Sequence, residues 1–334
     1  MNLLSKDIQW ALGIARRRPF QCLVQVTNRC NMKCSFCDFW PNGVPSREEL
    51  TLADFERIAR ELAGIGRFLI SVEGGEPFVR PDLIEIVRAF ARWHVPVLYT
   101  NGWYVESESA RELFAAGLTQ VGVSIDFPDA ERHNKKRVLE GAFARATRAI
   151  EYFRDAAPHG GKQVHIMTVL MKDNQDDIES MLKLSASLNV GHCFTLIAEK
   201  GFRRGNTRAM PTRSLSSELT ELWSRYPHMR MFRDYLSRID TFLAQGDMPA
   251  CHAGRQSFNI DHGGNVSPCI EKIDRAAGNV RNEPLQDIVA RMHDLPEVRT
   301  CQDCWTLCRG FSQALGNGGN ARSWVDLATR MRSR

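Results

Sequence analysis

Short apolar runs alternate with amphipathic segments over residues 20–200. The apolar runs predict β-strands at 21–27, 67–73, 95–100, 119–126, 162–171 and 191–198. Between them apolar residues recur three and four positions apart, as in Leu52, Phe55 and Ile58, which is the spacing of one helix face. Strands separated by single helices predict a parallel α/β sheet with right-handed crossovers. Six such units indicate a partial (β/α)6 TIM-like barrel, although a doubly wound sheet has a similar pattern.

The pattern changes after residue 198. Residues 199–212 are basic and contain glycine, which predicts a loop, and a helical stretch is predicted from 213 to 246. Further on, residues 259–268 predict a β-hairpin, because Gly263 and Gly264 lie between extended residues. The chain therefore has a large α/β part followed by a smaller part of different character.

Composition limits the cellular setting. Of the 334 residues 43% are hydrophobic and 25% are charged, which is typical of globular proteins, and the formal net charge is +5. No apolar stretch approaches 18 residues and no signal peptide is recognisable at the N-terminus, so we expect a cytoplasmic chain without a membrane span. Dense basic runs with interleaved aromatic residues are missing, which predicts no nucleic-acid partner. The amphipathic run before Arg16 predicts a short helix packed on the domain, with a membrane-surface contact as the alternative.

Ten cysteines dominate the candidate chemistry. In a chain without a secretion signal, this many cysteines indicate metal binding or redox chemistry rather than disulfide bonds. Cys30, Cys34 and Cys37 form a C-x3-C-x2-C triplet directly after the first predicted strand. Three close thiolates leave one iron of a [4Fe–4S] cluster open for a ligand, whereas zinc sites pair their cysteines differently. Cys22 and Cys193 stand alone on apolar runs, and we expect both in the core.

Polar and glycine-containing motifs follow the other strands. Gly74-Gly75-Glu76-Pro77 follows the second strand, Thr100-Asn101-Gly102 the third and Ser124-Ile125-Asp126 the fourth. Barrel enzymes place their active sites at the carboxyl ends of the strands. We therefore expect these motifs and the cysteine triplet on one face of the barrel.

The triplet and these motifs, in this order over residues 20–200, resemble the radical S-adenosylmethionine (SAM) superfamily. The resemblance implies that Cys30, Cys34 and Cys37 hold a [4Fe–4S] cluster and that SAM binds its open iron. Reductive cleavage of SAM then yields a 5′-deoxyadenosyl radical that takes a hydrogen atom from the substrate. The residues implied in SAM binding are Phe36 beside the adenine, Gly75 and Glu76 at the ammonium group, Ser124 and Asp126 at the ribose, and Gly74, Pro77 and Asn101 nearby.

Some of these motifs have simpler alternatives. Gly74-Gly75 is also compatible with a tight turn before a helix, and Pro77 fits that turn. Ser124 and Asp126 are also suited to capping a helix. Phe36 is also compatible with ordinary packing.

A second group of cysteines follows residue 250. The order of Cys251, the G-x4-C motif ending at Cys269, Gly278-Asn279-Val280 and the C-x2-C pair resembles the SPASM/Twitch auxiliary domain. With five cysteines available, the resemblance implies one auxiliary [4Fe–4S] cluster held by four of them. We assign Cys251, Cys269, Cys301 and Cys304, and Cys308 is either a spare or a replacement for Cys301. A three-cysteine cluster open to substrate and a zinc site that includes His252 or His262 are the alternatives.

The resulting hypothesis is a radical SAM enzyme that oxidises or modifies a small biosynthetic molecule. The spacing of the later cysteines resembles that of radical dehydrogenases of aminoglycoside precursors. Only 29 residues precede Cys30, too few for the N-terminal peptide-recognition domain of many peptide maturases, so a maturase of a ribosomally made peptide is the second hypothesis. A non-catalytic two-cluster electron carrier is the third. An electron donor such as flavodoxin or ferredoxin is the implied partner.

Domain boundaries follow from these patterns. The predicted divisions are a helical lead-in at 1–19, a radical SAM core barrel at 20–212, a helical connector at 213–249, a small Twitch/SPASM-like cluster domain at 250–315 and a tail at 316–334. Arg203, Arg204 and Arg208 lie in the loop after the sixth strand, which strand order places above the barrel mouth. Because arginine binds carboxylate and phosphate well, we predict that at least one of them contacts an anionic group of the substrate.

Overall fold

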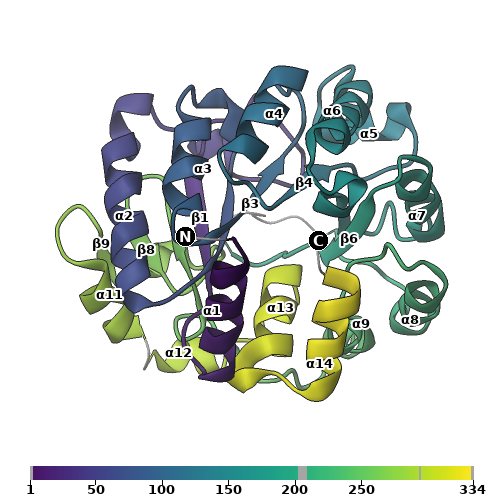
Figure 1. The fold of residues 1–334 in the computed structure, drawn as a ribbon. Coiled ribbons are helices and arrows are strands. Elements are labelled where there is room, and N and C mark those ends of the chain that lie inside the picture. The colour runs from purple at the N-terminus through teal and green to yellow at the C-terminus, as the bar shows by residue number, and fades with distance from the viewer. Residues whose placement is uncertain (1–2, 202–208, 293–294, 332–334) are drawn as a thin grey trace.

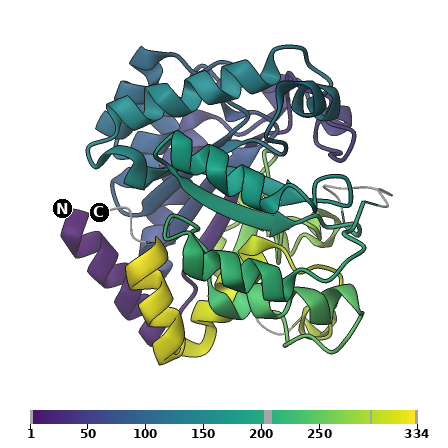
Figure 2. The ribbon, with the colours of Figure 1, turned by 90° about the vertical axis from the view of Figure 1, so that its right-hand side faces the viewer.

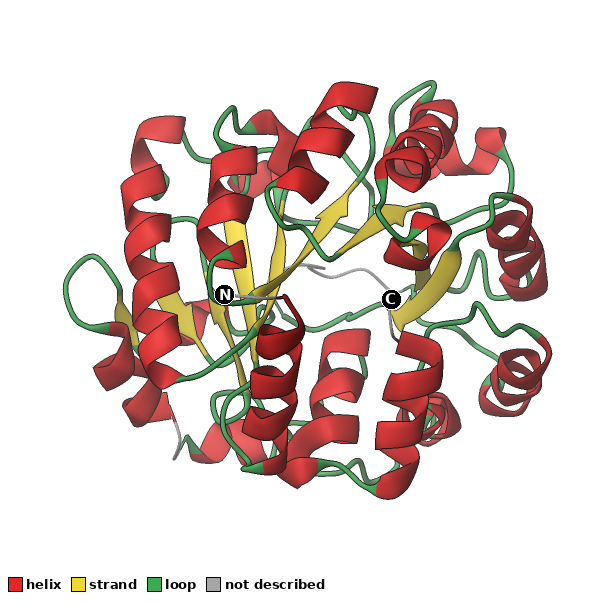
Figure 3. Ribbon diagram, in the orientation of Figure 1, coloured by secondary structure: helices red, strands yellow, loops and turns green. Residues whose placement is uncertain are grey.

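A single curved sheet organises the protein (Figures 1 and 3). The computed structural model describes residues 3–201, 209–292 and 295–331. Six strands pair in parallel in the order of the chain: β1 (Gln21–Thr27), β2 (Leu69–Gly74), β3 (Val95–Thr100), β4 (Gln120–Ser124), β5 (Val164–Leu170) and β6 (Gly191–Leu196). All six predicted strands are confirmed, with bounds that differ by two residues at most. The sheet stays open, with β6 at one edge, as a partial barrel requires.

Helices cover the outer face of the sheet (Figure 3). They are α2 (Leu52–Ile65), α3 (Leu83–Ala91), α4 (Ser107–Ala115), α5 (Ala130–Arg137), α6 (Ala142–Ala156) and α7 (Ile178–Ser187). In α2 the predicted apolar face, including Phe55 and Ile58, is buried. A capping box of Thr51 and Asp54 begins this helix and satisfies backbone N–H groups that would otherwise lack partners.

The sheet continues beyond β1 into the C-terminal part of the chain. β7 (Ser257–Ile260) pairs in parallel with β1, and β8 (Asn265–Ser267) and β9 (Gly278–Asn279) follow in antiparallel order. The predicted hairpin is confirmed as β7 and β8. In its turn Asp261 Oδ1 accepts hydrogen bonds from the backbone of Gly263 and Asn265. The second cysteine group is therefore built directly onto the barrel sheet.

The predicted helical stretch 213–246 is divided into separate helices. It contains three short helices: α8 (Ser216–Arg225), α9 (Arg233–Ser237) and α10 (Ile239–Leu243). Between α8 and α9 the backbone runs extended beside β6, where His192 exchanges backbone hydrogen bonds with His228 and Arg230 at 2.9 and 2.7 Å. Pairing with the sheet uses the backbone groups that a continuous helix would need, and Pro227 cannot donate one.

The first helix of the chain lies beside its last helices, below the sheet in the view of Figure 1 and side by side again in Figure 2. α1 (Leu3–Ala15) packs there near α13 (Leu307–Leu315) and α14 (Ala321–Asp326), with Trp10 against Phe20 and Phe311. The prediction that the N-terminal helix packs on the domain is confirmed. The remaining helices are α11 (Leu285–Met292), α12 (Pro296–Arg299) and a π-helical turn at Leu327–Met331. None of the described helices has the length and apolarity needed to cross a bilayer.

Candidate active site

The curved sheet encloses a cavity of about 790 Å³, lined by inward-facing side chains of β1 to β6. Cys30, Cys34 and Cys37 line it near the carboxyl ends of the strands. Of the other predicted site residues, those that line the cavity are Phe36, Gly74, Gly75, Asn101 and Ser124. Four segments that are far apart in sequence thus converge on one cavity.

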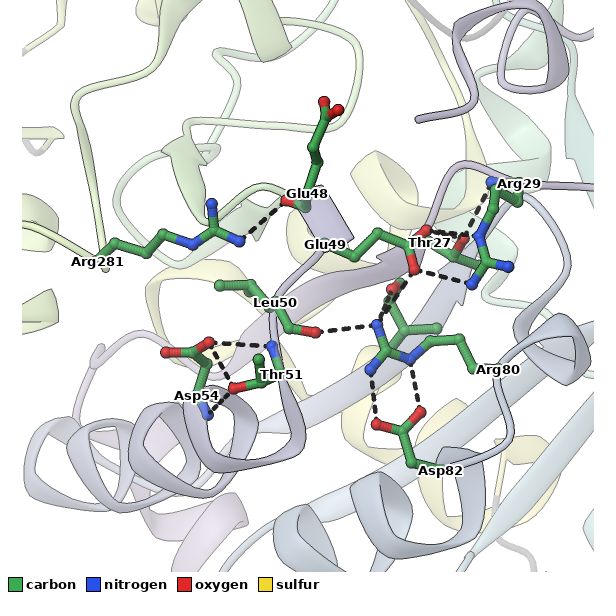
Figure 4. A network of polar contacts seen from close by, with 11 residues as sticks. Thr27, Arg29, Glu48, Glu49, Leu50, Thr51, Asp54, Arg80, Asp82 and Arg281 are labelled. Atoms are coloured by element: carbon green, nitrogen blue, oxygen red, sulfur yellow. Dashed lines mark hydrogen bonds and ion pairs between the residues drawn. The ribbon is translucent and has the colours of Figure 1, made fainter. Parts of the chain in front are cut away.

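A buried ionic network holds the start of the cysteine loop, the segment that carries Cys30, Cys34 and Cys37, in place (Figure 4). Glu49 is 3% exposed and accepts hydrogen bonds from Arg29 Nε at 3.1 Å and Nη2 at 2.9 Å, and from the Thr27 hydroxyl. Arg80 donates to the backbone oxygens of Val26 at 3.1 Å and Leu50 at 3.0 Å. The network therefore fixes the end of β1 immediately before Cys30. Sequence analysis missed Glu49 and Arg80, because no local pattern marks contacts that span 20 to 54 positions.

The two glycines after β2 allow the backbone to approach the cysteine loop closely. A Cβ atom on Gly74 would lie 2.1 Å from the Thr27 oxygen, and one on Gly75 would lie 2.2 Å from the Arg29 oxygen. Gly74 also has a φ of +132°, which disfavours other residues. The amides of Gly75 and Glu76 donate to those same oxygens at 2.7 and 2.9 Å. The motif thus holds the loop before Cys30 in place.

Glu76 joins the ends of two strands. Its buried carboxylate accepts hydrogen bonds from Thr100 Oγ1 at 2.7 Å, Asn101 N at 2.7 Å and Phe78 N at 3.1 Å. Burial raises the pKa of Glu76 to about 7, although these hydrogen bonds oppose the shift. Neither Glu76 nor Pro77 lines the cavity; Pro77 begins a short 3-10 turn.

Asn101 reaches from the end of β3 to the cysteine loop. Its Nδ2 donates to Asn31 Oδ1 at 2.9 Å and lies 3.9 Å from Cys30 Sγ. Its Oδ1 accepts a hydrogen bond from the Trp103 amide at 2.9 Å. The side chain is thereby oriented with its donor group toward Cys30.

Asp126 and Ser124 face different surroundings. Ser124 lines the cavity, whereas Asp126 is fully buried and forms a 2.6 Å ion pair with Arg137. Arg137 also lies 3.9 Å from Cys34 Sγ and 5.4 Å above the Phe36 ring. Arg137 was missed by sequence analysis, since it is one of three consecutive basic residues in α5 and resembles a solvated helix end.

Burial disfavours the thiolate forms of Cys30 and Cys34. Burial raises the pKa of Cys30 to about 12 and also raises that of Cys34, whereas Arg137 lowers the latter. The Met32 amide donates to Cys30 Sγ at 3.4 Å. Buried sulfurs that face N–H donors suit a cationic metal centre, whose potential such donors tune.

The second cysteine group lines a smaller cavity of about 70 Å³. Cys251, Cys269, Cys301, Cys304 and Cys308 all contribute to its wall, and neither His252 nor His262 does. Burial raises the pKa of Cys304 to about 12 and raises those of Cys269 and Cys301. This donor set is compatible with an iron–sulfur cluster.

Cys308 differs from the other four cysteines because it lines both cavities. It lies in the first turn of α13, where Thr306 Oγ1 and Cys308 Sγ are 3.0 Å apart. The wall between the two cavities therefore includes a cysteine.

The remaining sequence predictions have mixed outcomes. Cys22 and Cys193 are buried, as expected, and Cys193 also lines the large cavity. Arg203, Arg204 and Arg208 lie outside the described residues.

Comparisons with known proteins agree with this arrangement. The family model described as the radical SAM superfamily matches residues 24–185, and the SPASM model, an iron–sulfur cluster-binding domain, matches residues 251–308. An AdoMet-dependent heme synthase of Methanosarcina barkeri is 34% identical over 285 residues, which cover 79% of this chain and 80% of the relative. The enzyme of that name from Nitratidesulfovibrio vulgaris is 25% identical over 307 residues, 85% of this chain and 82% of the relative. The crystal structure of Streptococcus suis SuiB shares the fold, with a TM-score of 0.64, 16% identity and coverage of 84% of this chain and 67% of SuiB.

Proposed function

The chain belongs to the radical SAM superfamily, and on this premise we propose that it removes a hydrogen atom from a small biosynthetic molecule. It is an enzyme that uses SAM, a [4Fe–4S] cluster and an auxiliary iron–sulfur cluster. When bound, these groups supply a 5′-deoxyadenosyl radical. The protein's own residues position the reactants and exclude water and side reactions.

Cys30, Cys34 and Cys37 are the proposed ligands of the SAM-binding cluster. The observation that carries the proposal is that all three line one cavity, together with donors aimed at the sulfurs of Cys30 and Cys34. Glu76 and the two glycines before it hold the neighbouring backbone. Phe36, Asn101 and Ser124 line the space where SAM would bind.

The auxiliary cluster is proposed to use Cys251, Cys269, Cys301 and Cys304. The shared cavity supports this set, and the position of Cys308 at the wall of both cavities supports its role as the fifth, non-ligating cysteine. We place the core barrel at residues 20–212 and the cluster domain at 250–315. A donor such as flavodoxin or ferredoxin is the proposed source of electrons.

A small substrate is favoured by the size of the large cavity. Its volume of about 790 Å³ falls within the usual range of small-molecule sites, and SAM would fill part of it. The heme synthases among the relatives also bear the name of a small-molecule product. Modification of a ribosomally made peptide remains the competing substrate class, and the assay below separates the two.

The test is an anaerobic assay of reconstituted protein with dithionite and SAM. We expect slow release of 5′-deoxyadenosine without substrate, none from a Cys30→Ala, Cys34→Ala, Cys37→Ala variant, and faster release when a low-molecular-weight metabolite fraction is added. A protein with both clusters that never forms 5′-deoxyadenosine would contradict the proposal. Stimulation by a peptide fraction alone would favour the peptide class.

A further inference from the structure

A buried arginine lies at the end of the large cavity remote from the cysteine loop. Arg230 belongs to the extended segment between α8 and α9, lines the cavity and is 5% exposed. Its guanidinium donates to the Lys162 backbone oxygen and, at 3.4 Å, to Gln120 Oε1. Among the described residues no carboxylate forms an ion pair with Arg230. A buried cation without a countercharge is costly, so this position favours an anionic ligand.

Two glycines make room for polar side chains at the same level of the sheet. The strand register aligns Tyr99, Gly122, His165 and Gly191 across β3 to β6. A Cβ atom on Gly122 would lie 2.7 Å from both the Tyr99 ring and His165 Nε2, and one on Gly191 would lie 2.5 Å from Arg230 Nε. Tyr99 and His165 therefore lie over Gly122, and Arg230 lies over Gly191, all inside the cavity.

His165 is the second unsatisfied group at this level. It is 3% exposed and lines the cavity, and neither ring nitrogen has a hydrogen-bond partner among the described residues. Burial, and then the positive charge of Arg230, lower the pKa of His165 to about 3, so the ring is neutral. A neutral imidazole offers one donor and one acceptor. Buried polar groups normally have partners, so a ligand is expected to supply them.

We propose that Arg230 and His165 bind a terminal carboxylate of an elongated substrate whose other end lies beside Cys30, Cys34 and Cys37. This inference rests on the proposed function and adds a substrate class to it. One guanidinium balances the single charge of a carboxylate, whereas a phosphate dianion would leave a buried negative charge uncompensated.

The wall between the two ends of the cavity sets the shape of that substrate. Met167 and Val169 of β5 line it together with Cys193 and Thr195 of β6, so the part of the ligand that lies along β5 contacts apolar side chains. His165 and Val169 are four residues apart on β5, which at about 3.3 Å per residue corresponds to roughly 13 Å. The carboxylate and the reacting carbon are thus separated by a distance of this order.

Calorimetry with octanoate and octan-1-ol tests the carboxylate site on anaerobically reconstituted protein with SAM. We expect octanoate to bind at least tenfold more tightly than octan-1-ol. Arg230→Met should abolish that preference, and Arg148→Met, at an exposed arginine of α6, should retain it. Equal binding of the two probes, no binding of octanoate by the wild-type protein, or an unchanged preference in Arg230→Met would each overturn the inference.

A second variant covers the case in which Arg230→Met fails to fold. Gly191→Ala keeps the guanidinium but forces it to move, because the new Cβ atom would lie 2.5 Å from Arg230 Nε. We expect octanoate affinity to fall at least fivefold and octan-1-ol affinity to stay the same; equal octanoate affinity overturns the inference. Calorimetry needs no radical chemistry, so wild-type protein that binds octanoate but never cleaves SAM would contradict only the proposed function.

Discussion

Arg137 Nη2 lies 2.6 Å from Asp126 Oδ2 in an ion pair buried beside the cysteine loop. Asp126 also accepts a hydrogen bond from the Val169 amide at 3.0 Å, which ties β5 to the end of β4. The other face of the Arg137 guanidinium group lies 5.4 Å from the Phe36 ring, within the range of a cation–π contact. One residue of α5 therefore links the cysteine loop to two strand ends.

Replacement of Arg137 by Met should destabilise the protein by about 3–5 kcal/mol, because it leaves the buried Asp126 carboxylate without its partner. A second change, Asp126→Asn, should restore more than half of the loss, since Asn keeps an acceptor for the Val169 amide. Chemical denaturation of the wild-type protein, of Arg137→Met and of the double variant measures both effects. Arg88→Met breaks an exposed pair with Glu85 and should cost less than about 1 kcal/mol. Equal losses in Arg88→Met and Arg137→Met would contradict the interpretation.

Gly75→Ala should weaken SAM binding at least tenfold, because its Cβ atom would lie 2.2 Å from the Arg29 oxygen and displace the loop before Cys30. Equilibrium dialysis with SAM measures the effect. The matched control is Gly64→Ala in α2, where no atom lies within 4 Å of the new Cβ. That change should leave SAM binding intact and stabilise the helix by roughly 0.5–1 kcal/mol. Wild-type SAM affinity in Gly75→Ala would show that the close approach is dispensable.

His94 should contribute to a fall in stability between pH 6.5 and pH 4. Burial lowers the pKa of His94 to about 4, and both ring nitrogens are used, since Nδ1 accepts from Phe68 N and Nε2 lies 2.9 Å from the Ala59 oxygen. The His94 side chain takes up a proton below about pH 6.5 in the unfolded chain, but only below about pH 4 in the folded chain. The contribution is therefore complete above pH 6.5 and is lost as pH falls through this window, by about 3 kcal/mol.

Denaturation midpoints at pH 7 and pH 4.5 check this pH dependence. His94→Gln should remove about 3 kcal/mol of this pH dependence and lower the stability at pH 7, and the remaining slope is that of His133, His165 and His192, whose pKa values burial also lowers. His159→Gln, at an exposed position, should follow the wild-type curve. A wild-type slope in His94→Gln would assign the acid sensitivity to other groups.

The fold was largely predictable because its strands are continuous apolar runs buried on both faces. β5 and β6 illustrate this, since their side chains pack both outward on helices and inward on the cavity. The break between α8 and α9 was not predicted, because helical periodicity cannot reveal that residues near His228 pair with the edge of β6. Such pairing is a tertiary effect that overrides local preference.

The site was predictable where one local motif carries the chemistry and unpredictable where distant charges meet. The cysteine triplet, Asn101 and Ser124 were recognised from short segments and do line the cavity. The contacts of Glu49 with Arg29 and of Arg137 with Asp126 depend on how the strands and α5 are brought together. Charged side chains are usually solvated, so their burial is invisible in a single sequence.

The iron content of the protein tests which of the eight cysteines in the two groups bind a cluster. Reconstituted wild-type protein should bind about eight irons per chain, and both the Cys30, Cys34, Cys37 triple alanine variant and Cys304→Ala should bind about four. Cys308→Ala should still bind about eight, because Cys308 lies at the wall of both cavities and is the proposed non-ligand. Iron and sulfide analysis with Mössbauer spectroscopy distinguishes these outcomes. Loss of four irons in Cys308→Ala would show that Cys308, and not Cys301, is a ligand of the auxiliary cluster. Stoichiometric zinc in the triple variant would show that the second cysteine group is a structural zinc site.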